Sequence, residues 1–276
     1  MRLGLVGVGL IGGSVALAAK RVEPQAKVLG LDVGGTADAA RAAGVIEEVA
    51  DFDALCRCDV IVLAAPVSAN LAWLDRLASA ETRAIVTDVG GTKRQMMAKA
   101  QALPSLAFIG GHPMAGSEHS GFQAASATLF EGRRWFLTPG PGASGAQTTR
   151  IESLVRQFGA KPAIADADMH DRVMAAVSAL PQVTASALMA VVGERVDDEG
   201  LAMSGPGLRD TTRLAGSAAT WMTDGLAHNS REVADAIDAL INELRLLRDQ
   251  LETPERARDL FARAQAWRNT LVRLDK

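Results

Sequence analysis

The sequence predicts an α/β fold in which a doubly wound, mostly parallel sheet is followed by an all-helical region. Two observations predict the sheet: an apolar strand at the N-terminus leads into a glycine-rich turn, and short apolar strands then alternate with helical segments. A third observation sets its limit, because the strand pattern stops near residue 166. We therefore expect a first domain over residues 1–166 and a second, helical domain over residues 167–276.

The strands expected in the first domain are apolar along most of their length. Strands buried on both faces have this composition, whereas a strand with one solvated face alternates. They are expected at residues 2–9, 27–32, 59–66, 83–90, 106–113, 133–139 and 161–166. Helices are expected between them, at residues 12–21, 37–44, 68–79 and 93–103. This alternation produces a parallel sheet with helices on both faces.

The second domain reads as helix throughout, and one of its helices carries a long apolar seam. The seam steps by four and three residues through Val233, Ile237, Leu240, Leu244, Leu247 and Leu251. Such a seam packs along another helix, either within the chain or in a second copy of it. We favour a homodimer through the helical domain, because so small a domain must bury the stripe somewhere. Thr253 and Pro254 are expected to begin a last helix.

Composition and charge argue against several classes of partner. The chain has 276 residues, 48% of them apolar, which is enough for a packed core. Its formal charge of −3, with both signs scattered, offers no basic face to nucleic acid. No apolar run reaches the roughly 18 residues of a membrane span. The first twenty residues imitate a secretory signal, but their five glycines argue against one.

The two cysteines predict neither a disulfide nor a metal site. Cys56 and Cys58 are so close in the sequence that a bond between them would be strained, and their spacing matches no common zinc pattern. We interpret them as reduced thiols of a cytoplasmic protein.

Three glycines after the first strand have the spacing of a dinucleotide-binding turn. Gly7, Gly9 and Gly12 form G-x-G-x-x-G between a strand and a helix. Gly7 permits the tight turn, Gly9 leaves room for a pyrophosphate, and Gly12 lets the helix pack closely on the strand. The amino end of that helix then faces the phosphates. This context predicts a Rossmann-type domain.

The expected cofactor is NAD, with NADP disfavoured. Asp32 ends the second strand, twenty residues after Gly12, where its carboxylate accepts hydrogen bonds from the adenosine ribose and repels a 2′-phosphate. The residues that follow, VGGT, offer no arginine for that phosphate. Leu10 and Ile11 in the turn, and Pro66 at the end of a neighbouring strand, complete the expected cofactor site.

The candidate catalytic residue is His112, in the segment IGGHPMAG. Ligands of doubly wound sheets bind beyond the carboxyl ends of the strands, and this segment follows such a strand. We expect Gly110 and Gly111 to let substrate or cofactor approach closely. A dehydrogenase needs a base for the hydroxyl proton as hydride departs, and imidazole titrates near neutral pH. The alternative is a histidine that is merely hydrogen-bonded in a loop.

At these residues the sequence resembles a known family, the prephenate and arogenate dehydrogenases of tyrosine biosynthesis. The matching segments run through both expected domains: GVGLIGGSVAL, TDVGGTK, GGHPMAGSEHSGFQAA, HDRVMAAVSALPQ and GLRDTTRLA. The resemblance implies NAD-dependent oxidative decarboxylation of a cyclohexadienol, an intertwined homodimer, and a cleft between the domains. It implies that His112 takes the proton from the ring hydroxyl. It also implies that Arg213 grips the ring carboxylate, with Arg209 as a supporting cation; the alternative for Arg213 is a surface salt bridge.

Two departures from the family pattern bear on the substrate pocket. Many members have serine where this chain has Gly91, and here Thr92 is the hydroxyl nearby. Many also have SHLPH where this chain reads SALPQ, so Gln182 stands in place of a histidine that contacts substrate in some relatives. We interpret these changes as an altered pocket with the activity retained.

The choice between arogenate and prephenate depends on the substrate side chain. Arogenate carries an ammonium group where prephenate has a keto group, so a nearby acid favours arogenate. Glu118 is the candidate acid, with Ser117 as a neutral contact; alternatively Glu118 caps the following helix. The uncharged Gln182 also points towards arogenate.

Two other functions stay open. An enzyme of the same superfamily that acts on a 3-hydroxy acid or an imine would usually use a lysine of the helical domain, yet residues 166–230 contain no lysine. A non-catalytic NAD-binding sensor would leave His112 and Arg213 without a role. In each case the expected ligand besides the dinucleotide is a small molecule.

Overall fold

The structure is a computed structural model that describes residues 1–117, 119–217 and 219–274, without the side chains at 219–221, 254 and 256. The chain divides into two compact units, Met1–Ser230 and Arg231–Lys276, which are considered separately. The domain boundary expected after residue 166 falls inside the first unit, where the last strand gives way to helices, and it stays a prediction.

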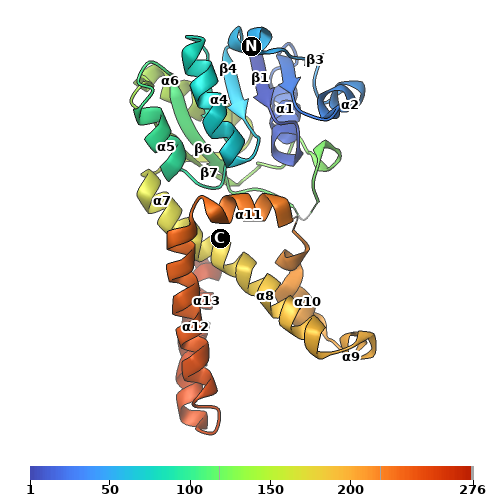
Figure 1. Ribbon diagram of the computed structural model, residues 1–276, viewed down its shortest axis with the longest axis vertical. Helices are drawn as coiled ribbons and strands as arrows, with labels where there is room; N and C mark the ends of the chain where they lie inside the picture. Colours follow the sequence, from blue (N-terminus) through green and yellow to red (C-terminus); the bar gives the residue numbers. More distant parts are fainter. Residues whose placement is uncertain (118, 218, 275–276) are drawn as a thin grey trace. The chain divides into compact units, whose positions relative to one another are not determined.

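An eight-stranded sheet forms the centre of the first unit (Figure 1). The spatial order is β3-β2-β1-β4-β5-β6-β7-β8, and neighbouring strands are parallel except β6 and β7. The strands are β1 (Arg2–Val6), β2 (Lys27–Leu31), β3 (Glu48–Val49), β4 (Val60–Leu63), β5 (Ile85–Asp88), β6 (Phe108–Pro113), β7 (Arg134–Pro139) and β8 (Lys161–Ile164). The order reverses between β1 and β4, which confirms the expected doubly wound, mostly parallel fold. Strand β3 was not expected, because its two exposed residues carry no apolar pattern.

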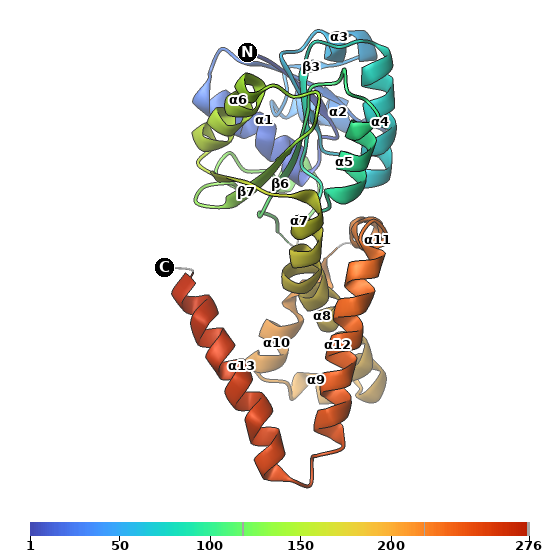
Figure 2. The same cartoon turned by 90° about the vertical axis from the view of Figure 1, so that its left-hand side faces the viewer.

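Helices cover both faces of this sheet (Figure 2). Each face has its own apolar core. One core takes in helices α1 (Leu10–Val22), α2 (Thr36–Ala42) and α6 (Gly145–Gln157). The other takes in helices α3 (Phe52–Cys56), α4 (Val67–Ser79) and α5 (Arg94–Gln101). Central strands such as β4 are buried at every residue, which is why they read as continuous apolar runs.

A long helix leads from the sheet into the remainder of the first unit. It consists of α7 (Ala167–Met174), the π-helical turn η2 (Ala175–Ala179) and α8 (Leu180–Arg195). Asp166 caps its start by accepting the Met169 amide at 2.9 Å. Pro181 cannot donate a backbone hydrogen bond, and the π-helical turn ends just before it, at Ala179.

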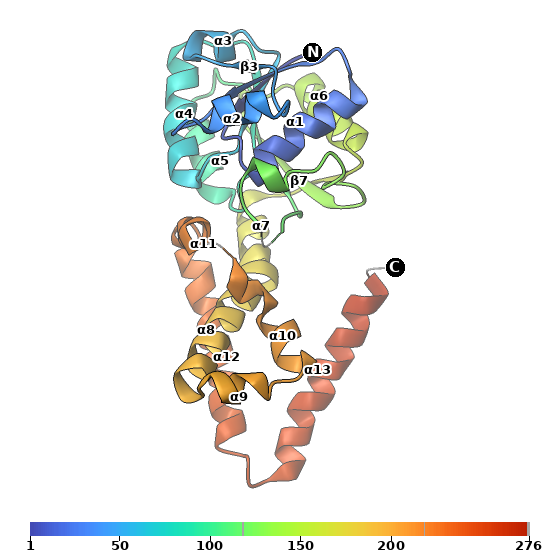
Figure 3. The ribbon, with the colours of Figure 1, turned by 90° about the vertical axis from the view of Figure 1, so that its right-hand side faces the viewer.

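Shorter helical elements follow α8. They are α9 (Asp198–Ala202), α10 (Pro206–Thr212), the 3₁₀ turn η3 (Arg213–Gly216) and α11 (Ala219–Ala227), and α11 contacts α4. Both α10 and η3 pack on α8 (Figure 3). This packing brings η3 next to the start of α8, where Gln182 donates to the Leu214 carbonyl at 2.7 Å.

The helix Ala167–Arg195 is long and apolar enough to cross a membrane, with a mean hydropathy of 1.6 over its most apolar window. The sequence predicts no such segment, because polar residues interrupt the apolar run. Helices of ordinary helical domains also meet this criterion. The apolar side chains that it exposes include Val173, Val177 and Val191.

The second unit is a hairpin of helices α12 (Ser230–Arg248) and α13 (Pro254–Leu274). Pro254 begins the last helix, as expected. Within the hairpin Arg263 forms an ion pair with Glu243 at 3.1 Å. The expected seam follows α12 as far as Leu247, and Leu251 lies beyond the end of this helix. Leu244 and Leu251 are more than half exposed.

Candidate functional site

The glycine turn after β1 is shaped as the sequence predicts. Gly7 has a φ of +92°, which favours glycine, and a Cβ there would lie 2.6 Å from the backbone of Ala64. A Cβ on Gly12 would lie 2.1 Å from the Gly7 carbonyl oxygen, so only glycine lets α1 start this close to the strand. A Cβ on Gly9 would meet no described atom within 4 Å. The turn is therefore closed at two glycines and open at the third, where a pyrophosphate would approach.

Asp32 lies just beyond the end of β2, as expected, and its carboxylate is held by two backbone amides. Val8 donates to Oδ2 and Val33 donates to Oδ1, each at 2.6 Å. Each oxygen keeps a lone pair that a ribose hydroxyl can use. Pro66 is exposed at the carboxyl end of β4, immediately before α4.

A cavity of about 640 Å³ joins the glycine turn to the helical part of the first unit. Gly9, Leu10 and Ile11 line it on the turn side, and Gln182 and Arg213 line it on the α8 and η3 side. The segment after β6 contributes Ala115–Ser117 and His119–Gly121. Expected cofactor residues and expected substrate residues therefore border the same cavity.

Arg213 is the positive group of this cavity. It stands at the start of η3 with an exposed side chain, and in the described part of the chain nothing pairs with its guanidinium. The guanidinium is thus available for a carboxylate. Arg209 lies on α10 with an exposed side chain and is not among the described residues that line the cavity.

The other expected substrate residues have different surroundings. Ser117 lines the cavity, and its hydroxyl is bonded to the backbone of His119 at 3.2 Å. Gln182 also lines it, but its amide is committed to the Leu214 carbonyl and to Ser217. Thr92 is buried, and its hydroxyl has no hydrogen-bond partner among the described residues. Glu118 lies outside the described residues.

His112 lies on β6, paired with Phe136 of β7, and its side chain is partly exposed. Its Nδ1 is 2.9 Å from Nε2 of His170, on α7. Its Nε2 faces the backbone of Gly91, where a Cβ would lie 3.9 Å away. One ring nitrogen is thus held by a partner, and the other faces a position that lacks a side chain.

The glycine pair before His112 serves a different purpose from the one expected. A Cβ on Gly111 would lie 2.4 Å from the Asp88 carbonyl, and one on Gly110 would lie 3.1 Å from the Lys93 side chain. The prediction that these glycines admit substrate or cofactor is therefore wrong: their Cβ positions face protein. They allow β6 to approach β5 and the buried Lys93.

Asp88 joins the end of β5 to the segment that carries His112. Its Oδ1 accepts the Gly111 amide at 2.9 Å, and its Oδ2 accepts the Gly90 amide at 2.9 Å and the Lys93 ammonium at 2.5 Å. Both side chains of the Lys93–Asp88 pair are fully buried. Removing one partner would leave a buried charge uncompensated, so the pair fixes local geometry.

A second carboxylate stands behind His170. Asp171 Oδ1 lies 2.8 Å from His170 Nδ1 and accepts the Lys93 amide at 2.7 Å, while Oδ2 accepts the Arg94 amide at 2.8 Å. The side chains of His170 and Asp171 are fully buried. His112, His170 and Asp171 thus form a continuous hydrogen-bonded chain from the partly exposed imidazole to a buried carboxylate.

Burial and neighbouring charges shift the proton affinities along this chain. Burial lowers the pKa of His112 well below 6.5, and electrostatic interactions with His170 and Lys93 lower it further. Burial by itself would raise the pKa of Asp171, but hydrogen bonds from His170 and from the Arg94 and Lys93 amides outweigh that effect and lower it. Burial also lowers the pKa of Lys93, against the attraction of Asp88. His112 is therefore neutral and Asp171 ionised at neutral pH.

The family models match almost the whole chain. Residues 15–164 match the nucleotide-binding domain of prephenate dehydrogenase, and residues 166–265 match its dimerization domain. A prephenate dehydrogenase of Bacillus subtilis is 35% identical over 93% of this chain and 71% of its own length.

The chain belongs to the prephenate dehydrogenase family.

Solved structures of this family share the fold. The Aquifex aeolicus prephenate dehydrogenase, in complex with hydroxyphenyl propionate and NAD⁺, has a TM-score of 0.88 and 26% identity over 98% of both chains. The Synechocystis arogenate dehydrogenase has a TM-score of 0.78 and 28% identity, covering 98% of this chain and all of that one. These similarities include members named for each of the two cyclohexadienols.

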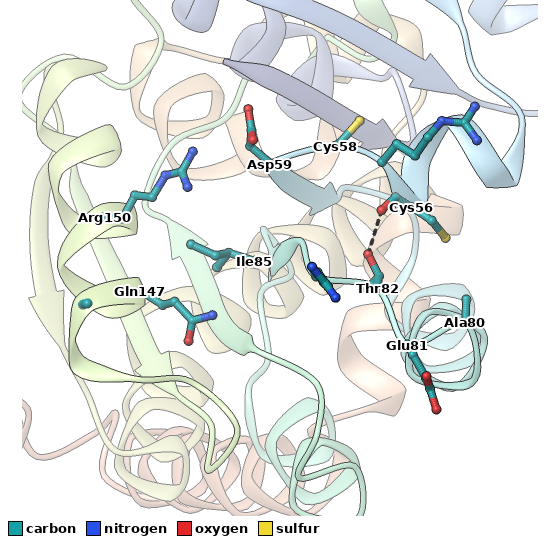
Figure 4. A pocket seen from close by; sticks show the side chains of 12 residues that line it. Cys56, Cys58, Asp59, Ala80, Glu81, Thr82, Ile85, Gln147 and Arg150 are labelled. Atoms are coloured by element: carbon teal, nitrogen blue, oxygen red, sulfur yellow. Dashed lines mark hydrogen bonds between the residues drawn. The ribbon is translucent and has the colours of Figure 1, made fainter.

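This member of the prephenate dehydrogenase family has a second cavity, of about 710 Å³, at the amino ends of β4 and β5 (Figure 4). Thr82 and Arg150 line it, and the Thr82 hydroxyl donates to the Cys56 carbonyl at 3.1 Å. None of the described residues that line it is a histidine. It lies at the edge of the sheet where doubly wound folds do not bind their ligands.

Sequence reasoning missed the residues that support His112. It treated His170 and Asp171 as the start of a helix, and it assigned no role to Lys93 or Asp88. A usable signal was the adjacent pair His170–Asp171 directly after the last strand, where the α7 N-terminus meets the carboxyl edge of the sheet. The contact itself joins residues 58 positions apart, so no local pattern could reveal it.

Proposed function

We propose that this chain is an NAD-dependent dehydrogenase that oxidatively decarboxylates a cyclohexadienol, arogenate or prephenate, in tyrosine biosynthesis. The observation that carries the proposal is a neutral imidazole, His112, held by one nitrogen at the carboxyl edge of the sheet. The segment that follows it lines a cavity, which runs from Gly9 to Arg213, an arginine without an ion-pair partner among the described residues. Membership of the prephenate dehydrogenase family supports the same reaction.

The residues present fit a bound dinucleotide. The open space at Gly9 would admit the pyrophosphate, with Leu10 and Ile11 beside it on the cavity wall. Asp32 would hold the adenosine ribose, and the exposed Val33 that follows offers no charge for a 2′-phosphate. Bound NAD would accept the hydride that leaves the ring carbon bearing the hydroxyl. These features favour NAD over NADP.

The chain's own residues then supply the base and the anchor. His112 Nε2 takes the hydroxyl proton of the substrate as the ring carbon loses hydride. The ring becomes a dienone, whose carbonyl accepts the electrons released when the carboxylate leaves as carbon dioxide. Arg213 binds a substrate carboxylate and sets the orientation of the ring, and aromatisation makes the reaction irreversible. Ser117, Gln182 and Thr92 remain candidate contacts, and so do Glu118 and Arg209.

We also propose that the chain acts as a homodimer through its helical region. Within the second unit, large apolar side chains are exposed on both helices: Leu244, Leu246, Leu251, Phe261, Trp267, Leu271 and Leu274. Patches of this kind mark interfaces. The same reasoning applies to the exposed valines of α7, η2 and α8, and it favours a protein partner over a membrane. The free Cys56 and Cys58 are consistent with a cytoplasmic location.

The activity is tested by incubating the purified protein with NAD and either prephenate or arogenate and following NADH. We expect turnover of at least one of them, with arogenate giving the higher kcat/KM. A higher kcat/KM for prephenate would contradict the arogenate preference. Absence of turnover with both, in a protein that binds NAD, would instead favour a sensor.

Dimerisation is tested by sedimentation of the wild type and of Trp267→Glu. We expect the wild type to sediment as a dimer. The variant should dissociate into monomers at protein concentrations where the wild type is still dimeric. A monomeric wild type at all concentrations would contradict the proposal.

A further inference from the structure

We propose that Asp171, acting through His170, fixes the tautomer of His112 so that Nε2 is the nitrogen free to act as a base. His170 and Asp171 are then positioning residues: His170 is hydrogen-bonded to His112, and Asp171 is hydrogen-bonded to His170. This inference rests on the proposed function for its catalytic meaning, but the tautomer is a property of the protein without substrate.

The first step is the fixed orientation of the carboxylate. Asp171 accepts the Lys93 amide on Oδ1 and the Arg94 amide on Oδ2, so both oxygens are tied to the backbone at the start of α5. Asn229 also donates to the Asp171 carbonyl at 2.8 Å, which holds the residue from its other side. An ionised carboxylate can only accept hydrogen bonds. Whatever faces it must therefore donate.

The second step is the tautomer of His170. Its Nδ1 lies 2.8 Å from Asp171 Oδ1, so Nδ1 carries the hydrogen. In a neutral imidazole the other nitrogen then has a lone pair. The ring is locked between neighbours, with Phe136 in edge contact at a centroid distance of 5.6 Å and His112 at 5.1 Å. His170 therefore presents an acceptor, Nε2, to His112.

The third step is the tautomer of His112 itself. Its Nδ1 lies 2.9 Å from the His170 acceptor, so Nδ1 carries the hydrogen and Nε2 is unprotonated. Nε2 is the nitrogen that faces Gly91, and it takes no part in the hydrogen bonds that join His112, His170 and Asp171. The sequence of donors and acceptors thus starts at one buried carboxylate and ends at one lone pair.

The charged groups around His112 are consistent with this role. Lys93 approaches from the start of α5 and is paired with Asp88, and His170 and Asp171 approach from α7. When Nε2 gains a proton, Nδ1–H still donates to His170, which in turn donates to the carboxylate. The chain can therefore stabilise the imidazolium without rearranging.

The decisive experiment is nitrogen-15 NMR of histidine-labelled protein, without substrate, at neutral pH. We expect His112 to carry its hydrogen on Nδ1 in the wild type. In His170→Phe, which keeps a ring beside Phe136 but cannot accept, we expect His112 to shift towards the Nε2–H tautomer. His228→Gln serves as the matched control, because His228 contacts Gln95 and Asp224 and not His112, His170 or Asp171. The loss of its signal also identifies the resonance of His228.

A kinetic arm uses whichever cyclohexadienol the wild type oxidises. We expect kcat of His170→Phe to fall about 100-fold, within the range of positioned acid–base catalysis, with the Kd for NAD unchanged. His170→Gln keeps an acceptor within reach of His112, so we expect it to recover part of kcat. If His170→Phe is unstable, the Kd of His170→Gln for NAD shows whether a substitution at residue 170 leaves the protein folded.

Two results would overturn the proposal. One is a wild-type spectrum with the His112 hydrogen on Nε2. The other is an unchanged His112 tautomer in a folded His170→Phe protein. Failure of the proposed function looks different, because it would abolish turnover in the wild type and leave the tautomer measurement intact.

Discussion

The two edges of the sheet carry cavities of similar size, about 640 Å³ at the carboxyl edge and about 710 Å³ at the amino edge. At the carboxyl edge, fully buried polar groups fix the neighbouring backbone: Asp88, Lys93 and Asp171. At the amino edge the charged lining residues Arg57, Arg83 and Arg150 are exposed. Buried, fully bonded polar groups, and not volume, therefore distinguish the proposed site at the carboxyl edge from the cavity at the amino edge.

The largest effect that would test this comparison is expected from replacing His112, at the carboxyl edge. We expect His112→Asn to lower kcat by roughly 100- to 10,000-fold, because the base is lost while the glycine turn is untouched. Steady-state kinetics and NAD titration measure the two effects. The matched change at the amino edge, Arg150→Ala, should alter kcat less than about twofold. Equal effects at the two edges would contradict the assignment.

A second test compares two arginines of the same segment. Arg213 is among the described residues that line the cavity, and Arg209 is not. We expect Arg213→Ala to lower kcat/KM by roughly 10- to 100-fold, mainly through KM, since a charged hydrogen bond contributes about 1.5–3 kcal/mol. Arg209→Ala should change it by only a few-fold. A larger loss in Arg209→Ala would exchange their assigned roles.

A third test separates stability from binding at two glycines. Gly111→Ala places a methyl group 2.4 Å from the Asp88 carbonyl, so we expect it to lower the free energy of unfolding by about 1–3 kcal/mol or more. Gly9→Ala has open space around it and should leave stability nearly unchanged while weakening NAD binding. Urea unfolding measures the stability of each variant, and NAD titration measures its affinity for the cofactor. A stable Gly111→Ala protein would show that β5 and β6 can move apart.

The smallest expected effect is the response to mild acid. A base must be unprotonated to work, and burial together with nearby positive charge lowers the pKa of His112 well below 6.5. The acid limb of log kcat against pH should therefore lie below pH 6.5, and activity should persist as the pH falls through that value. A limb at or above 6.5 would mean that the site raises the proton affinity of His112.

Much of the fold could be predicted from local patterns, because apolar runs and glycine spacing report directly on buried strands and tight turns. Gly7, Gly12 and Asp32 occupy the positions that their spacing predicts. The surroundings of His112 could not be predicted in the same way. Its hydrogen-bond partner, His170, lies on α7, and the Asp88 carbonyl that requires glycine at residue 111 lies on β5. Both contacts depend on how the elements are ordered in space.

The cavity also shows which part of the substrate pocket a sequence can indicate. Arg213 was identified by its motif, and it does line the cavity. The commitment of the Gln182 amide to the η3 backbone was invisible, because it requires α8 and η3 to be side by side. Residue type predicts what a side chain can bond, whereas the packing of helices decides what it does bond.

The carboxylate of Asp88 has one more consequence, for hydrogen exchange. The Gly90 and Gly111 amides are both bonded to a side chain that is itself enclosed, so neither can meet solvent deuterium unless β5 and β6 separate. The strand that carries His112 should therefore exchange as slowly as the centre of the sheet. In that case His112, the proposed base, lies on a strand that opens only rarely. It would keep its position during any local unfolding that leaves β5 and β6 paired.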